Sequence, residues 1–281
     1  MSKLGRVEIS GELEIECEEA GSGARAFVLV HGFTGSRDDW REHLPPLSRL
    51  GRTLALDQRG HGGSSNTGDP AGYTLDGLRA DLAECLSSLD ANPCDLLGHS
   101  MGGMVALRYV LAHPERVRSL ILMDTAAGAL EVPEATRKIM EGVAQLARSA
   151  GMGAVVEMMR GAMEGGALGA AAPVAADAFD TSFERTRPKL EQMDPEAFAT
   201  LGQSLFQEPD VIDRLSEIRC PTTVIVGEAD LPFREASEVM AAEIQEAELV
   251  VIPESAHQPQ LENPKAWFEA VEHHLRRVRS S

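Results

Sequence analysis

A serine between glycines is the first feature of the sequence that could do chemistry. Ser100 lies in the run Gly98-His99-Ser100-Met101-Gly102, which matches the pattern G-x-S-x-G. A short apolar run precedes the pattern and a helical pattern follows it, a context that places a nucleophilic serine on a sharp turn between strand and helix. Such a turn lifts the hydroxyl clear of the sheet and aims the start of the helix at the reacting group. The pattern therefore predicts that Ser100 is a nucleophile.

A serine hydroxyl is a weak nucleophile until a base takes its proton. With this kind of serine turn, the acid and then the histidine follow later in the chain. His257 lies in a loop between the last strand pattern and the last helical pattern, at the sheet edge where α/β active sites form. His273 and His274 lie inside that last helical pattern, and we expect both to be solvated surface residues. His257 is therefore the predicted general base.

The base needs an acid that holds the imidazole in one tautomer and stabilises its protonated form. Asp230 ends the run Gly227-Glu228-Ala229-Asp230, which directly follows a buried strand pattern. Asp124 ends the preceding strand pattern and is the competing candidate. The chain order favours Asp230 as the acid, with Glu228 pointing elsewhere.

Two backbone N–H groups are candidates to stabilise negative charge on a carbonyl oxygen. One belongs to Met101, directly after the serine, and the other to Phe33, in the turn that follows the strand pattern at 26–30. We expect His31 to brace this turn by hydrogen bonding, and the run from Asp57 to Gly62 to form a structural turn beneath the site. The sequence contains no cluster with metal-ligand spacing, so neither a metal nor another cofactor is predicted.

Short apolar runs alternate with helical patterns along most of the chain. The expected buried strands are 26–30, 53–56, 94–97, 120–123, 222–226 and 249–252, and the expected helices are 75–90, 101–112 and 264–278. Residues 6–9 and 12–17 alternate apolar and polar side chains, as in an antiparallel edge hairpin. The pattern predicts an α/β fold with a mainly parallel, doubly wound sheet.

Residues 126–215 break this alternation. The segment is rich in Ala, Gly and Met and has no convincing strand pattern, so we interpret it as a helical lid inserted between two strands. A few of its methionines should face the substrate, because methionine adapts to varied apolar groups. The run from Gly165 to Ala176 is expected to be a mobile loop.

The net charge of -18 over 281 residues argues against nucleic acid and anionic membranes as partners. No signal segment or membrane span is apparent, and the four scattered cysteines (Cys17, Cys85, Cys94 and Cys220) indicate buried free thiols in a reducing compartment. We therefore expect a cytoplasmic protein whose partner is a small-molecule substrate. Self-association into a homo-oligomer stays open.

Together these motifs resemble the α/β-hydrolase superfamily over nearly the whole chain. The resemblance is carried by His31-Gly32-Phe33, Asp57-Gln58-Arg59-Gly60-His61-Gly62, Gly98-His99-Ser100-Met101-Gly102-Gly103, Gly227-Glu228-Ala229-Asp230 and His257. It implies one domain over residues 1–281, with an eight-stranded, mainly parallel sheet, a triad of Ser100, His257 and Asp230, and a lid after the sixth strand.

Three kinds of function are compatible with this resemblance. The first is a serine carboxylesterase or lactonase that acts on a small, largely apolar substrate through an acyl-enzyme on Ser100. The second is a C–C bond hydrolase or a lyase similar to the menaquinone-pathway synthases, although those have Arg shortly after the serine turn and this chain has Met104. The third is a ligand receptor of the same fold. Epoxide hydrolases and haloalkane dehalogenases have Asp in place of Ser100 and are disfavoured.

Overall fold

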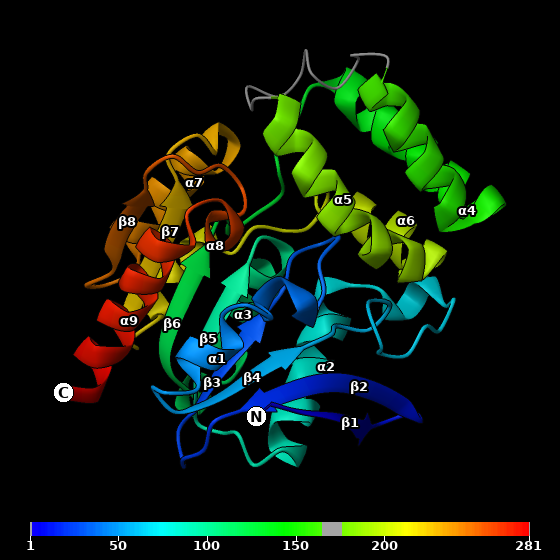
Figure 1. Cartoon of the computed structure of the whole chain (residues 1–281). Coiled ribbons are helices and arrows are strands. Elements are labelled where there is room, and N and C mark those ends of the chain that lie inside the picture. Colours follow the sequence, from blue (N-terminus) through cyan, green and yellow to red (C-terminus); the bar gives the residue numbers. More distant parts are fainter. Residues whose placement is uncertain (1, 165–175, 281) are drawn as a thin grey trace.

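A computed structural model describes residues 2–164 and 176–280, in which the strands join into a single eight-stranded sheet (Figure 1). Its strands are β1 (Lys3–Ile9), β2 (Leu13–Ala20), β3 (Ala26–Val30), β4 (Arg52–Leu56), β5 (Cys94–His99), β6 (Val117–Met123), β7 (Thr222–Gly227) and β8 (Glu248–Ile252). Their order across the sheet is β1-β2-β4-β3-β5-β6-β7-β8. The β1–β2 and β2–β4 pairs are antiparallel and all other pairs are parallel. The predicted sheet and its edge hairpin are confirmed.

The central strands are apolar on both sides because helices cover both faces of the sheet. In β3, Ala26, Val28 and Val30 join one part of the core, whereas Phe27 and Leu29 join the other. Neighbouring residues of a strand point to opposite faces, so a strand buried on both faces reads as one continuous apolar run.

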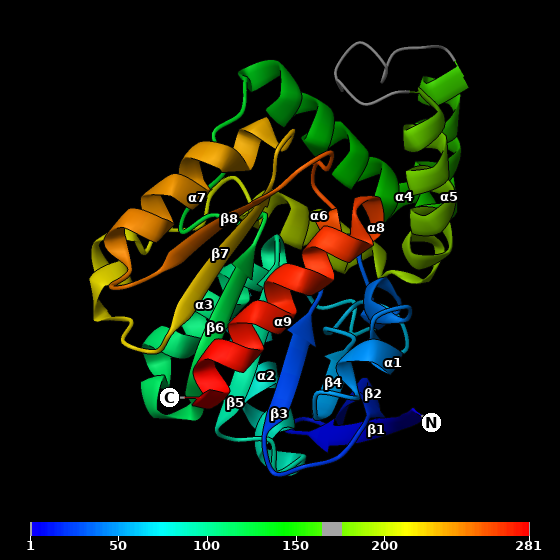
Figure 2. The same cartoon turned by 60° about the vertical axis from the view of Figure 1, so that its left-hand side comes forward.

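The helices divide between the two faces. One face packs against α2 (Leu75–Ser88), α3 (Met101–Ala112) and α7 (Leu231–Glu243). The other packs against α1 (Leu44–Leu47) and α9 (Pro264–Ser280), which lie in front of the sheet in Figure 2. The shorter helices are η1 (Arg37–Trp40), η2 (Pro70–Gly72), η3 (Pro114–Arg116), η4 (Ile212–Glu217) and α8 (Pro259–Glu262).

The segment between β6 and β7 is helical, as the composition indicated. It contains α4 (Glu134–Glu164), α5 (Ala176–Gln192) and α6 (Pro195–Ser204), and its described residues form no strand. These three helices lie together beyond the arrowheads of the central strands (Figures 1 and 2). Gly151 interrupts α4 with φ 78°, a backbone angle that favours glycine. Of the run expected to be a mobile loop, all but Ala176 lies outside the described residues.

The expectation that His273 and His274 are both solvated is wrong for His274. His273 is exposed, but His274 faces the sheet and is buried to 1% exposure, with its Nδ1 atom 2.8 Å from the Thr223 hydroxyl. Burial, followed by the charge of Arg277, lowers the pKa of His274 to about 3. Two adjacent residues on a helix point about 100° apart, so one can be solvated while the next enters the core.

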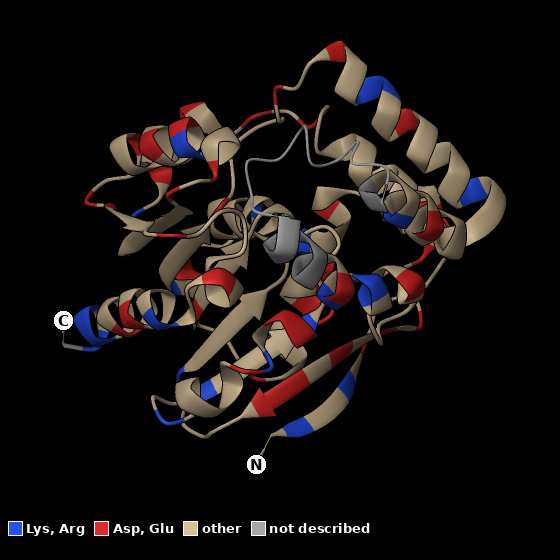
Figure 3. Ribbon diagram, turned by 45° about the horizontal axis from the view of Figure 1, so that its top comes forward, with Lys and Arg blue, Asp and Glu red and all other residues tan. Residues whose placement is uncertain are grey.

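Figure 3 marks the charged residues along the ribbon. Acidic residues are spread over the helices and the β1–β2 hairpin, and basic residues gather at the carboxyl end of α9, where Arg277 and Arg279 complement the helix dipole. In the described part of the chain, no helix combines the length and apolar character needed to cross a bilayer. The four cysteines are free; Cys17, Cys85 and Cys94 are buried and Cys220 is partly exposed.

Candidate active site

Ser100 lies on a strained turn between β5 and α3. Its backbone angles are φ 52° and ψ -121°, a combination that residues with a side chain rarely adopt. The strain is held by neighbours on β6 and beyond: the Ser100 N–H donates to Met123 O at 2.9 Å, and the Thr125 hydroxyl donates to Ser100 O at 2.7 Å. A strained backbone that its surroundings hold in place is typical of a functional position.

The glycines around Ser100 let three segments approach one another closely. A Cβ atom on Gly98 would lie 2.3 Å from Gly102 O, and one on Gly102 would lie 2.4 Å from His31 O. Both distances are well inside van der Waals contact, so the serine turn requires glycine at these positions. The close approach brings the loop after β3 against the nucleophile.

His257 connects Ser100 to Asp230. His257 Nε2 is 3.1 Å from Ser100 Oγ, and His257 Nδ1 is 2.8 Å from Asp230 Oδ2. Because the carboxylate only accepts, Nδ1 carries the proton and Nε2 is left to accept the serine proton. Asp230 is buried at the start of α7, whereas His257 lies in the loop between β8 and α8 and is partly exposed. The structure thus brings together the three residues predicted from widely separated parts of the chain.

Two neighbours fix the position of His257. The His99 ring donates from Nε2 to the backbone oxygen of His257 at 2.7 Å, and the Phe233 ring stacks on the imidazole with centroids 4.8 Å apart. Burial, followed by the charge of His257, lowers the pKa of His99 to about 3, so His99 stays neutral near pH 7. The contact between His99 and His257 joins residues far apart in the chain, so no local pattern of residues predicts it.

Asp124 lies beside this arrangement but does not bond to the imidazole. It directly follows β6, has φ 44°, is fully buried, and accepts a hydrogen bond from the Gly227 N–H at 2.8 Å through Oδ1. One carboxylate oxygen of Asp124, one of Asp230 and one ring nitrogen of His257 lie within 4.8 Å of one another. Among the described residues, no other three acidic or histidine side chains form such a cluster. The geometry supports Asp230 as the partner of His257 and leaves Asp124 as a second carboxyl group behind it.

The loop that carries Phe33 is braced as predicted. The neutral His31 ring accepts from the Gln58 N–H at 3.0 Å and donates from Nδ1 to Gly32 O at 2.7 Å, while burial lowers the pKa of His31 well below its ordinary value. His61 Nε2 lies 2.6 Å from Phe33 O. A Cβ on Gly32 would lie 3.1 Å from Ser100 Cβ, so this loop passes directly beside the nucleophile.

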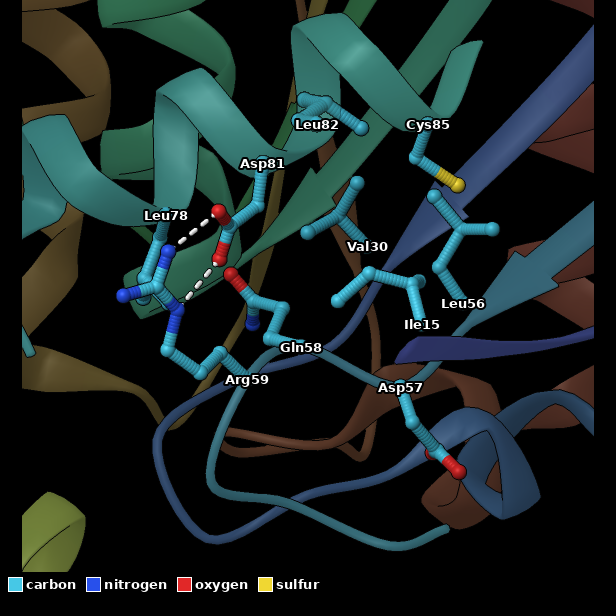
Figure 4. Close-up of a pocket in the computed structure, with 10 residues that line it drawn as sticks. All are labelled: Ile15, Val30, Leu56, Asp57, Gln58, Arg59, Leu78, Asp81, Leu82 and Cys85. Atoms are coloured by element: carbon cyan, nitrogen blue, oxygen red, sulfur yellow. Dashed lines mark hydrogen bonds and ion pairs between the residues drawn. The ribbon is translucent and has the colours of Figure 1, made fainter. Parts of the chain in front are cut away.

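The turn after β4 packs against the loop that carries Phe33, with Gln58 bonded to His31 and His61 bonded to Phe33 O. Arg59 forms an ion pair with Asp81 of α2, with Arg59 Nε 2.7 Å from Asp81 Oδ2 (Figure 4). The Asp57 carboxylate accepts from the Arg37 N–H at 2.6 Å and the Gly63 N–H at 2.9 Å. The cavity shown in Figure 4 has a volume of about 20 Å³ and is too small for a substrate. The turn is therefore structural.

The pocket above Ser100 has a volume of about 270 Å³. Its apolar walls come from Phe33, Phe233 and two residues of the segment 126–215, Leu130 and Leu205. The expectation that lid methionines face the substrate is wrong for the described residues, none of whose methionines line this pocket. Met152 and Met193 are buried in the core instead, because helix packing rather than composition decides which side chains reach a pocket.

Two further hollows adjoin the pocket. One of about 260 Å³ shares Asp39 with it and is lined by basic and acidic side chains of η1 and α5, among them Arg37, Asp38 and Lys189. The other, of about 790 Å³, shares Leu130 and lies between the start of the segment 126–215 and α7. Each hollow thus borders the pocket through one shared lining residue.

The fold and the Ser100 turn define an α/β hydrolase, and comparison with known proteins agrees. The sequence profile of the alpha/beta hydrolase fold family matches residues 25–264, so the chain belongs to this family.

Several relatives match nearly the whole chain. A thermophilic esterase from Thermogutta terrifontis, solved with malate bound, is 30% identical with a TM-score of 0.81 and covers 98% of this chain and 99% of its own. A protein of Bacillus subtilis (strain 168), provisionally named a 2-succinyl-6-hydroxy-2,4-cyclohexadiene-1-carboxylate synthase, is 26% identical over 92% of this chain and 93% of its own. The enol-lactonase from Burkholderia xenovorans LB400 shares the fold at 23% identity, with a TM-score of 0.79 over 96% and 99% of the chains. The family and the esterase likeness support a hydrolase.

Proposed function

We propose that this protein is a carboxylesterase or lactonase that cleaves a small, largely apolar substrate through an acyl-enzyme on Ser100. The observation that carries the proposal is the hydrogen-bonded chain from Asp230 through His257 to Ser100 Oγ, with steps of 2.8 and 3.1 Å, at the floor of a pocket with apolar walls. Likeness to the thermophilic esterase supports the same reaction class.

The first half of the reaction acylates the serine. His257 Nε2 takes the hydroxyl proton as Ser100 Oγ attacks the ester carbonyl, and Asp230 stabilises the imidazolium that forms. The backbone N–H groups of Phe33 and Met101 are proposed to donate to the carbonyl oxygen, which becomes negative in the tetrahedral intermediate. His257 then returns the proton to the leaving alcohol oxygen, and the carbon–oxygen bond breaks.

The second half releases the acid. A water molecule gives a proton to His257 Nε2 and attacks the acyl carbon. The tetrahedral intermediate then collapses, Ser100 Oγ leaves and regains a proton from His257, and the carboxylic acid departs.

The charges near the pocket favour neutral or singly charged substrates. Arg37 and Lys189 line the hollow beside it, but Arg37 pairs with Asp38 and Asp57, and Lys189 pairs with Asp39. Arg37 and Lys189 thus each have a nearby carboxylate, whereas a multiply anionic substrate requires arginines that converge on it without such partners.

A C–C hydrolase or synthase-like lyase is the second candidate, because the provisionally named Bacillus subtilis synthase matches along nearly its full length. Met104 occupies the place of that branch's arginine and is buried in the core. A panel of p-nitrophenyl esters, lactones and diketones distinguishes the two candidates, with esters or lactones expected to turn over fastest. Turnover of any of them also argues against a pure ligand receptor.

The test of the nucleophile is covalent labelling. A fluorophosphonate should modify one serine per chain, and Ser100→Ala should abolish both labelling and p-nitrophenyl ester turnover. Ser149→Ala, which removes an exposed serine of α4, is the matched control and should label like the wild type. Stoichiometric labelling that persists in Ser100→Ala would refute the proposal.

A further inference from the structure

Asp124 is a second carboxyl group in the site, and its surroundings decide its protonation state. Its Oδ1 atom accepts from the Gly227 N–H, whereas its Oδ2 atom is buried and has no donor among the described residues. A buried carboxylate oxygen without a donor is costly, whereas a protonated oxygen becomes a donor itself and needs only an acceptor. The carboxylate of Asp230 is such an acceptor, since one of its oxygens lies within 4.8 Å of an Asp124 oxygen.

We propose that Asp124 is a neutral carboxylic acid that donates a hydrogen bond from Oδ2 to Asp230 and so positions the acid that holds His257. The inference rests on the proposed function, in which Asp230 is the ionised member of the triad. Asp124 is a positioning residue, because the ring of His257 bonds to Asp230 and Ser100 and not to Asp124, and Asp124 does not line the substrate pocket.

The charges around Asp124 support the neutral form. The titratable groups near it are Asp230 at the start of α7, Glu262 of α8 and His257 from the loop between β8 and α8. Burial is the largest cause that raises the pKa of Asp124 well above its ordinary value; the hydrogen bond and charge of Asp230 and the charge of Glu262 add to it, against the Gly227 N–H. Two carboxyl groups this close and this buried hold one proton between them more readily than none.

The backbone of Asp124 is strained and is held in place by its neighbours. Asp124 has φ 44°, which costs energy for a residue with a side chain, and its own N–H is anchored to Ile225 O at 2.9 Å. This conformation lets one carboxyl group reach both the Gly227 N–H on β7 and the side chain at the start of α7. The position thus ties the end of β6 to the residue that orients the imidazole.

Substitution by asparagine separates a neutral Asp124 from an ionised one. An asparagine copies a protonated acid, because its oxygen accepts from Gly227 and its amide group donates to Asp230. We expect Asp124→Asn to keep kcat within a few-fold of wild type and to leave the midpoint of the acid limb of the kcat/KM profile unchanged. If Asp124 were ionised, the loss of its charge beside His257 would lower that midpoint by about one pH unit. Such a shift would overturn the proposal.

Removing the donor tests the positioning role. Asp124→Ala should lower kcat by about ten- to a hundredfold with little change in KM, because Asp230 loses a hydrogen bond to its charged carboxylate. An Ala variant with wild-type kcat and pH profile would also overturn the proposal. Asp95→Asn is the matched control, because Asp95 is another fully buried aspartate but lies near the start of β5, at the end away from Ser100. It should leave the midpoint of the acid limb of the kcat/KM profile unchanged.

Infrared difference spectroscopy reports the protonation state of Asp124 directly. It requires neither turnover nor a folded Asp124→Ala variant. The carbonyl stretch of a protonated carboxyl group should be present in the wild type at pH 7 and absent in Asp124→Asn. If both proteins lack it, Asp124 is ionised and the inference fails. If Ser100→Ala were still active, the proposed function would fail, while the infrared result would still report the protonation of Asp124.

Discussion

At the scale of single residues, the choice of acid depends on a distance of a few ångströms. Asp124 directly follows β6, and Asp230 lies in the turn after the neighbouring strand β7. Their side chains therefore meet at the same edge of the sheet. Asp230 bonds to His257 Nδ1, whereas Asp124 turns toward Gly227. Chain order had favoured Asp230, and the contact with His257 supports that choice.

We predict that Asp230→Asn will lower kcat by about ten-thousand-fold while the fold survives, because an amide facing Nδ1 stabilises the wrong imidazole tautomer. Steady-state kinetics and circular dichroism on the purified variant measure the two effects. Glu228→Gln, which changes an exposed carboxylate two residues away, is the control and should leave kcat unchanged. A crippled Asp124→Asn together with a nearly active Asp230→Asn would show that Asp124 is the acid.

At the scale of elements, one buried ion pair joins α5 to the active-site loop. Lys189 of α5 pairs with Asp39 of η1, with side chains only 10% and 6% exposed. Asp39 also receives a hydrogen bond from the Ser36 N–H and lines the substrate pocket. The pair therefore ties the helical segment to the base of the loop that carries Phe33.

We predict that Lys189→Met will lower the free energy of unfolding by about 3 kcal/mol, because it leaves the buried Asp39 carboxylate without its cation. KM should rise as well, since Asp39 is a wall of the pocket. Lys138→Met removes an exposed lysine of α4 that pairs weakly with Glu134, and urea unfolding should show little change for it. Equal stability of the two variants would mean that the Lys189 pair contributes nothing.

The helical segment also supplies the apolar wall that should select the acyl group. We predict that Leu205→Ala and Leu130→Ala will shift the preference among p-nitrophenyl esters toward longer chains, because both changes enlarge the pocket. Fluorophosphonate labelling of Ser100 should stay intact. Met158→Ala, which changes an exposed methionine outside the pocket, should leave the chain-length profile unchanged. An unaltered profile in all three variants would exclude the segment from substrate selection.

At the scale of the whole molecule, buried histidines couple stability to pH. The folded-state pKa of His274 is about 3, below the ordinary value of 6.5 that the unfolded chain restores. The unfolded state therefore binds a proton first as the pH falls. The stability that the neutral His274 provides is complete above pH 6.5 and is lost progressively as the pH falls from 6.5 toward 3.

We predict that the free energy of unfolding will fall between pH 7 and pH 5, with about 2 kcal/mol of the loss due to His274. In His274→Asn the loss over this range should be smaller by that amount, as measured by urea unfolding at the two pH values. His273→Asn is the matched control, because the neighbouring ring is exposed, and its pH dependence should equal that of the wild type. The same result for both variants would contradict the assignment.

The net charge of -18 acts at this scale too. It still predicts that nucleic acid and anionic membranes are not partners. The cytoplasmic location likewise stays a prediction, and self-association into a homo-oligomer stays open.

The sequence by itself determined the fold class and most of the reacting groups. Continuous apolar runs separated by helical patterns identify strands buried on both faces, and the glycines around Ser100 identify the one turn where strand and helix can pass so closely. These signals are local, because they depend on the periodicity of neighbouring residues and on backbone sterics. For the same reason, the place of His257 in the chain was enough to select it over His273 and His274.

Only the tertiary structure decided which side chains meet. It placed Asp230 against His257 with Asp124 behind it, set the His99 ring against the His257 carbonyl, and buried His274. It also brought Leu130 and Leu205 to the pocket in place of methionines. These contacts join residues that are distant in the chain, and their geometry depends on the packing of whole elements. No local pattern of residue types encodes that packing.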